Sequence, residues 1–151
     1  MTDEQAMSGK AIYDMFFQHG EVRPLFRKEY ISLWSGWLGK ERLYLLDQVS
    51  EEEWSRFNRL LLAAFGAFRT GVVNHAEEAV EFATRLEPLL SDYQDSMRKD
   101  ASQFSQFVMP ALDCVITEEW DYTYILWHRN TEALEAIKPL LSEAKLLHFS
   151  D

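Results

Sequence analysis

Apolar side chains that recur every three or four residues are the feature that most restricts the fold of this sequence. Such a stripe lets one side of an α-helix pack against its neighbours. The spacing predicts about five helices. Their expected ranges are 3–18, 25–38, 50–69, 74–97 and 131–147. We therefore expect a predominantly α-helical protein.

Capping residues mark where three of these helices begin. Ser50 is followed by three glutamates, and Glu53 stands where a capping box needs its acid, so each of the two residues can bond the backbone amide of the other. Asn74 and Asn130 precede two further patterns and can cap them. Pro88 lies inside the fourth pattern and predicts a kink or a restart, because proline has no amide donor.

The pattern changes between about residues 112 and 128. There β-branched and aromatic residues gather between Pro110 and Asn130, interrupted by an acidic stretch, 118–121. This composition favours a short antiparallel β-hairpin. The predicted fold is therefore α+β, mostly helical, with one C-terminal hairpin followed by a final helix. The alternative makes 111–129 a buried helix within an all-α helical bundle, since short apolar runs fit both structures.

Length and composition indicate one compact domain, 1–151, because the chain has no repeat and no linker that could divide it. The lone Cys114 excludes an internal disulfide. No stretch approaches the ~20 apolar residues that span a bilayer, so we expect no membrane partner. Residues 1–10 are polar and acidic, unlike a secretory signal, and we expect a cytoplasmic location.

The negative charge is unevenly distributed. The chain carries a net charge of -10; residues 1–72 hold 9 basic and 10 acidic side chains, whereas residues 73–151 hold 6 basic and 15 acidic ones. Nucleic-acid binding needs a concentrated field of lysine and arginine, which this chain lacks, so we expect no nucleic acid. An acidic half instead suits a basic protein partner.

Each linear catalytic pattern fails at a specific residue. The glycine spacing of a phosphate loop occurs at 66–71, but Val72 and Val73 stand where lysine and serine or threonine must be. No histidine has glutamate three residues before it, as di-iron sites need, and His75 with Glu78 supplies only two ligands. We predict no catalytic residue, no metal and no cofactor, and we favour a non-enzymatic protein.

Two groups of residues are candidate binding sites. Trp120 lies at the predicted turn, where burial is hardest, and three carboxylates surround it in the sequence. An interface hot spot that binds a basic surface would have this composition. The candidate partner-binding residues are Glu118, Glu119, Trp120, Asp121 and Tyr122. The second group could line a ligand pocket between helices. Its residues are Tyr30, Trp34, Trp37 and His75.

These observations lead to a first functional hypothesis with two alternatives. Small acidic domains of this composition resemble immunity proteins as a broad class, which implies a small cytosolic inhibitor that covers a basic surface of its partner. The first alternative is an enzyme or small-ligand-binding helical protein with an aromatic-lined pocket. The second is a structural or self-assembling subunit, in which the aromatic stripe of residues 26–37 forms a homo-oligomer interface.

Overall fold

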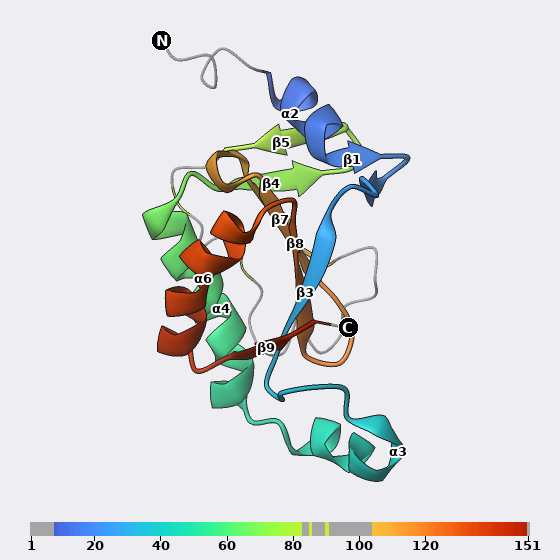
Figure 1. The fold of residues 1–151 in the computed structure, drawn as a ribbon, viewed down its shortest axis with the longest axis vertical. Coiled ribbons are helices and arrows are strands. Elements are labelled where there is room, and N and C mark those ends of the chain that lie inside the picture. The colour runs from blue at the N-terminus through green and yellow to red at the C-terminus, as the bar shows by residue number, and fades with distance from the viewer. Residues whose placement is uncertain (1–7, 83–84, 86–89, 91–103, 151) are drawn as a thin grey trace.

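A large antiparallel sheet dominates the computed structural model, which describes residues 8–82, 85, 90 and 104–150 (Figure 1). Its seven strands lie in the order β5-β4-β6-β7-β8-β3-β9, and β1 and β2 form a separate pair. The strands are β1 Phe17–Gln18, β2 Glu21–Val22, β3 Arg27–Ser32, β4 Gly71–Asn74, β5 Ala79–Glu81, β6 Gln106–Met109, β7 Cys114–Glu118, β8 Thr123–His128 and β9 Leu147–Phe149. The described helices are α2 Gly9–Phe16, α3 Gly39–Arg42, α4 Glu51–Ala67 and α6 Thr131–Glu143, with 3-10 turns η1 Leu43–Gln48 and η4 Pro110–Leu112.

The prediction of a predominantly helical protein is wrong, and so is its all-α alternative. Two of the expected helices are replaced by strands in the part of the chain that the structure describes. The fold is a mixed α+β arrangement built on the seven-stranded sheet.

The first replaced helix is 25–38, which contains β3 instead. Tyr30 and Ile31 are adjacent in sequence and both are buried, although they point to opposite faces of the sheet. A strand covered on both faces carries consecutive apolar residues, which also fit a helical stripe. β8 pairs with the whole length of β3 on one side, and β9 pairs with Tyr30–Ser32 on the other.

The second replaced helix is 74–97, whose described beginning forms the hairpin of β4 and β5. Asn74 does not cap a helix: its side-chain oxygen accepts from the amide of Glu77 at 3.2 Å inside the hairpin turn. Glu78 completes the turn with a left-handed φ of 51°. The predicted kink at Pro88 lies outside the described residues.

Other predicted elements are confirmed. β7 and β8 form the expected hairpin, in which Cys114 pairs with His128. The capping box between Ser50 and Glu53 is present at the start of α4, and Asn130 caps α6 through the amide of Ala133. The last helix ends at Glu143, earlier than predicted, because the chain turns there and continues as β9.

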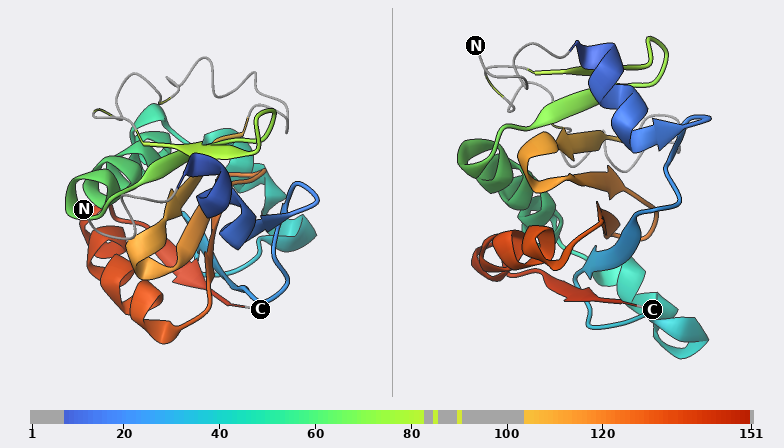
Figure 2. Two further views of the ribbon diagram at one scale, coloured as in Figure 1. Left: turned by 90° about the horizontal axis from the view of Figure 1, so that it is seen from above. Right: turned by 45° about the horizontal axis from the view of Figure 1, so that its top comes forward.

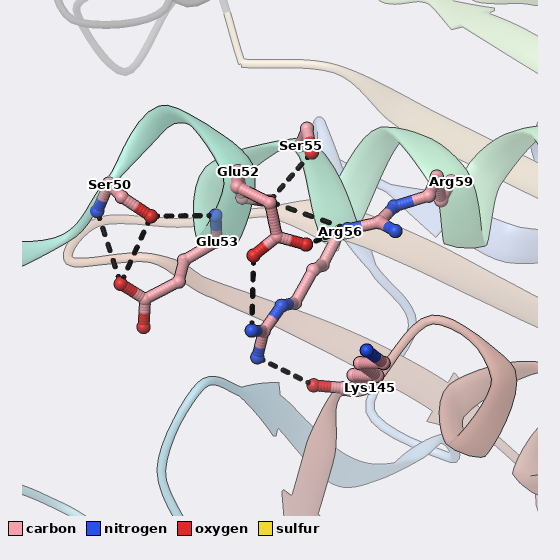
Figure 3. A network of polar contacts seen from close by, with 7 residues as sticks. All are labelled: Ser50, Glu52, Glu53, Ser55, Arg56, Arg59 and Lys145. Carbon is pink, nitrogen blue, oxygen red and sulfur yellow. Dashed lines mark hydrogen bonds and ion pairs between the residues drawn. The ribbon is translucent and has the colours of Figure 1, made fainter.

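A polar link joins the two long helices (Figure 3). Arg56 of α4 donates to a carboxylate oxygen of Glu52 at 3.1 Å and to the carbonyl oxygen of Lys145 at 3.2 Å, just beyond α6. Lys145 has a left-handed φ of 60°, and the amide that follows it, Leu146, returns to the carbonyl of Leu141 at 2.9 Å. This is the hydrogen-bond pattern of a Schellman C-cap.

Alternate residues of the central strands supply two separate cores. α4 and α6 lie side by side over one face, where they contact residues such as Phe107, Ile116 and Leu126 (Figures 1 and 2). α2 covers part of the other face and contacts Val108 and Val115. No described helix has the length and apolar character needed to cross a membrane. α2 leaves the end of its face near β8, β3 and β9 to other cover, and the candidate site lies there.

Candidate functional site

A groove of about 400 Å³ lies on this second face of the sheet, and we call it the aromatic groove. The strands β3 and β8 supply Tyr30, Thr123 and Ile125. One wall comes from the segment that follows β3, and the other comes from the turn between β7 and β8. The wall residues are Trp34, Gly36, Trp37, Leu38, Gly39, Leu43, Leu46, Glu119, Trp120 and Asp121.

Trp37 is the main aromatic side chain of the first wall. Its ring meets the ring of Tyr30 edge to face at a centroid distance of 4.7 Å, and that of Phe149 at 5.0 Å. Tyr30 and Phe149 stack on each other at 5.4 Å. These contacts hold the indole in place, yet 55% of Trp37 stays exposed to solvent. The first wall therefore presents an ordered aromatic surface.

Trp120 is the corresponding side chain of the second wall. It is 58% exposed, and its ring meets the ring of Phe104 edge to face at 4.8 Å. The two residues after it, Asp121 and Tyr122, have left-handed φ angles of 60° and 54°. That conformation costs a residue with a side chain roughly 1 to 2 kcal/mol. The turn is thus held in a strained shape that leaves Trp120 at its tip.

A chain of hydrogen bonds orients one carboxylate of the groove. The indole nitrogen of Trp127 donates to the hydroxyl of Thr117 at 2.9 Å, and this hydroxyl donates to Oε2 of Glu119 at 2.8 Å. The second oxygen of Glu119 is left to accept from another donor. Because Thr117 is buried, the geometry of this carboxylate is set by the sheet.

The charged side chains that line the groove, among the described residues, are Glu119 and Asp121, and both are acidic. Neither is paired with a lysine or arginine of the described chain. Arg42 lies close in sequence but donates to the carbonyl oxygens of Leu38 and Trp37, at 3.3 and 3.1 Å. The polar edge of the groove therefore accepts hydrogen bonds and favours cations.

The five candidate partner-binding residues separate into two sets. Glu119, Trp120 and Asp121 line the groove. Glu118 is buried, and its carboxylate accepts from the amide of Ser105 at 2.8 Å. Tyr122 is partly buried against the core formed with α4 and α6. Glu118 and Tyr122 thus support the turn from inside, whereas Glu119 is half-buried and Trp120 and Asp121 are exposed.

The candidate pocket residues separate as well. Tyr30, Trp34 and Trp37 line the same groove as Trp120, so the structure merges most of the two predicted sites. His75 lies elsewhere, in the turn between β4 and β5. Its Nδ1 is 2.7 Å from the hydroxyl of Tyr13, and its Nε2 is 2.5 Å from Oε1 of Gln106. Burial raises the pKa of Tyr13. These bonds tie the turn to α2 and β6.

Sequence reasoning missed several lining residues. Leu38, Leu43 and Leu46 were not singled out, and nothing local marks them as part of a wall. The alternation of β8 places Thr123 and Ile125 on one face, which was a usable signal. The pairing of Tyr30 with Ile125 was not predictable, because the two residues are far apart in the chain.

The arrangement supports non-covalent binding. No group of three or more metal-ligating side chains occurs in the described ranges. Burial, together with the nearby charge of Asp113, raises the pKa of Cys114 to about 12, so its thiol stays protonated and unreactive near neutral pH. Exposed indoles beside two carboxylates, one of them oriented by Thr117, can instead hold a cationic group that packs on the rings.

Comparisons with known proteins assign no role to this groove. No family model matches the chain, and neither a curated protein nor a solved structure matches it. The residues of the groove themselves are therefore the basis for a functional proposal.

Proposed function

We propose that this protein is a non-enzymatic protein-binding module whose aromatic groove receives a basic segment of a partner protein. One observation carries the proposal: the exposed indoles of Trp37 and Trp120 share a groove with the carboxylates of Glu119 and Asp121. Covering such a segment is how an inhibitor of the immunity type would neutralise its partner.

The apolar part of the groove has the composition of an interface hot spot. Trp37, Leu43 and Trp120 are 55%, 48% and 58% exposed. Large apolar side chains that gather at one exposed place mark interaction sites, and tryptophan is enriched among the residues that dominate binding energy. Burying these side chains against a partner would supply most of the affinity.

The acidic side chains of the groove orient the partner and speed its association with the protein. Glu119 and Asp121 lie in the half of the chain that carries 15 acidic and 6 basic side chains. A negative surface steers a positive partner toward it, and salt weakens this steering. The proposal therefore predicts an association that slows as the salt concentration rises.

The groove argues against the two alternative functions. Its volume of about 400 Å³ fits a small ligand. Small-molecule sites, however, enclose most of their ligand, and more than half of Trp37 and Trp120 stays exposed. In a symmetric homodimer through this face, both copies would bring Glu119 and Asp121 into one interface, and no lysine or arginine of the described residues lines the groove to pair with these acids.

Affinity capture from the native host's lysate, at low and high salt, tests the proposal. Asp121→Lys should weaken retention of the partner roughly tenfold, since it replaces an attraction of up to ~1 kcal/mol by a comparable repulsion. Trp120→Ala should also weaken retention of the partner, and the loss should be the same at low and at high salt. Circular dichroism verifies that each variant is folded.

Glu143→Lys is the matched control, because it makes the same charge change in the last turn of α6, the helix that covers the face of the sheet opposite to the groove. A lysine there suits the negative end of the helix dipole. Equal losses for Glu143→Lys and Asp121→Lys would show that only net charge matters, which would refute the proposal. A dimer mass in solution that Trp120→Ala reduces to a monomer would overturn it in favour of self-assembly.

A further inference from the structure

We infer that the side chain received by the aromatic groove is an arginine in preference to a lysine; this inference rests on the proposed function. A guanidinium is planar and weakly hydrated, stacks on aromatic faces and directs several N–H groups at fixed angles. A lysine ammonium is compact and strongly hydrated. A site with flat rings and oriented oxygen acceptors therefore separates the two.

The flat rings are held in place before any partner binds. Trp37 is held edge to face by Tyr30 at 4.7 Å and by Phe149 at 5.0 Å, and Trp120 by Phe104 at 4.8 Å. Both indoles are still more than half exposed. Among the described residues, no lysine or arginine lies over the ring of Trp120. Stacking of a guanidinium there would need little rearrangement.

One of the two acceptors, the Glu119 carboxylate, is oriented too. Thr117 holds Oε2 of Glu119 at 2.8 Å and is itself fixed by the indole N–H of Trp127. The remaining oxygen of Glu119 and the exposed carboxylate of Asp121 both lie at the groove. A guanidinium can donate to acceptors on two residues while it stacks, whereas an ammonium has no plane with which to stack.

The same chain already contains this combination elsewhere. Arg129 forms two parallel hydrogen bonds with Asp113, at 2.7 and 2.6 Å, and its guanidinium lies 5.1 Å from the centroid of Phe26. A carboxylate on one side and an aromatic ring on the other thus suffice to position an arginine on this fold. The aromatic groove offers both groups to an arginine from outside.

Peptide binding tests the inference. Three short peptides share one Gly/Ser/Leu sequence and differ only at the central residue, which is arginine, lysine or citrulline, the uncharged isostere of arginine. Tryptophan fluorescence and calorimetry measure the affinity of each peptide. The arginine peptide should bind about fivefold more tightly than the lysine peptide. The citrulline peptide should bind more weakly than both, because it lacks the charge.

Two variants attribute the preference to the groove. Glu119→Gln should lower the arginine-to-lysine affinity ratio, because the guanidinium loses one charged acceptor while the rings remain, whereas the control Glu143→Gln should leave the ratio unchanged. Equal binding of the arginine and lysine peptides to the unaltered protein would refute the arginine preference and leave the proposed function standing. Binding of neither peptide would refute the preference, and the capture assay then decides separately whether the groove binds a basic partner.

Discussion

Alkaline pH should destabilise this protein through Cys114, and a single substitution isolates the effect. The side chain is completely buried, and burial raises the pKa of its thiol from an ordinary value of 9.0 to about 12, with Asp113 adding to the rise. Between these two values the unfolded chain has lost the thiol proton and the folded chain keeps it. The free energy of unfolding therefore falls as the pH rises through this range.

The two pKa values determine the size of the effect. At about pH 10.5, ionisation of the thiol in the unfolded chain lowers the free energy of unfolding by ~2 kcal/mol. Near neutral pH the thiol is protonated in both states, and this effect on stability vanishes. Tyr13 and Tyr124 also have pKa values raised by burial. They affect the unaltered protein and a Cys114 variant alike, so they cancel in the difference between the two.

The assay is urea unfolding of the unaltered protein and of Cys114→Ala, each at neutral pH and at about pH 10.5. At neutral pH the variant should be less stable by ~1 kcal/mol, because the alanine leaves a small cavity. Near about pH 10.5 the order should reverse, since alanine has no proton to lose. An unchanged stability difference at the two pH values would refute the reasoning and show that the thiol is not sequestered.

Three further predictions concern local interactions. Ser50→Ala should lower the free energy of unfolding by ~1 kcal/mol, because the capping box is lost. The control Ser55→Ala, in the same helix, should not lower it (Figure 3), and urea unfolding compares the two variants. Lys145→Gly should raise thermal stability by up to ~1 kcal/mol, because glycine adopts the left-handed φ of the C-cap without strain, and a lower melting temperature would contradict this. Thr117→Val should weaken partner capture without changing net charge, by releasing Glu119 from its orienting hydroxyl; unaltered capture by the folded variant would disprove that role.

Local signals predicted those elements whose stabilising interactions are local. The capping box at Ser50 and the cap at Asn130 join residues three apart in the chain, and both are present in the structure. The hairpin of β7 and β8 was predictable for a similar reason, because its strands are joined by a short turn and are rich in β-branched and aromatic residues. The exposure of Trp120 follows from its place in that turn.

The sequence by itself determined α4, α6 and the hairpin between 114 and 128, together with the acidic, aromatic character of the turn. Only the tertiary structure decided that the stretch around Tyr30 is a strand, since burial on both faces of a sheet imitates the spacing of a buried helix. It also decided that Trp37 and Trp120 share one groove. The physical reason is that β3 meets β8 through backbone pairing between distant parts of the chain, which local side-chain patterns do not record.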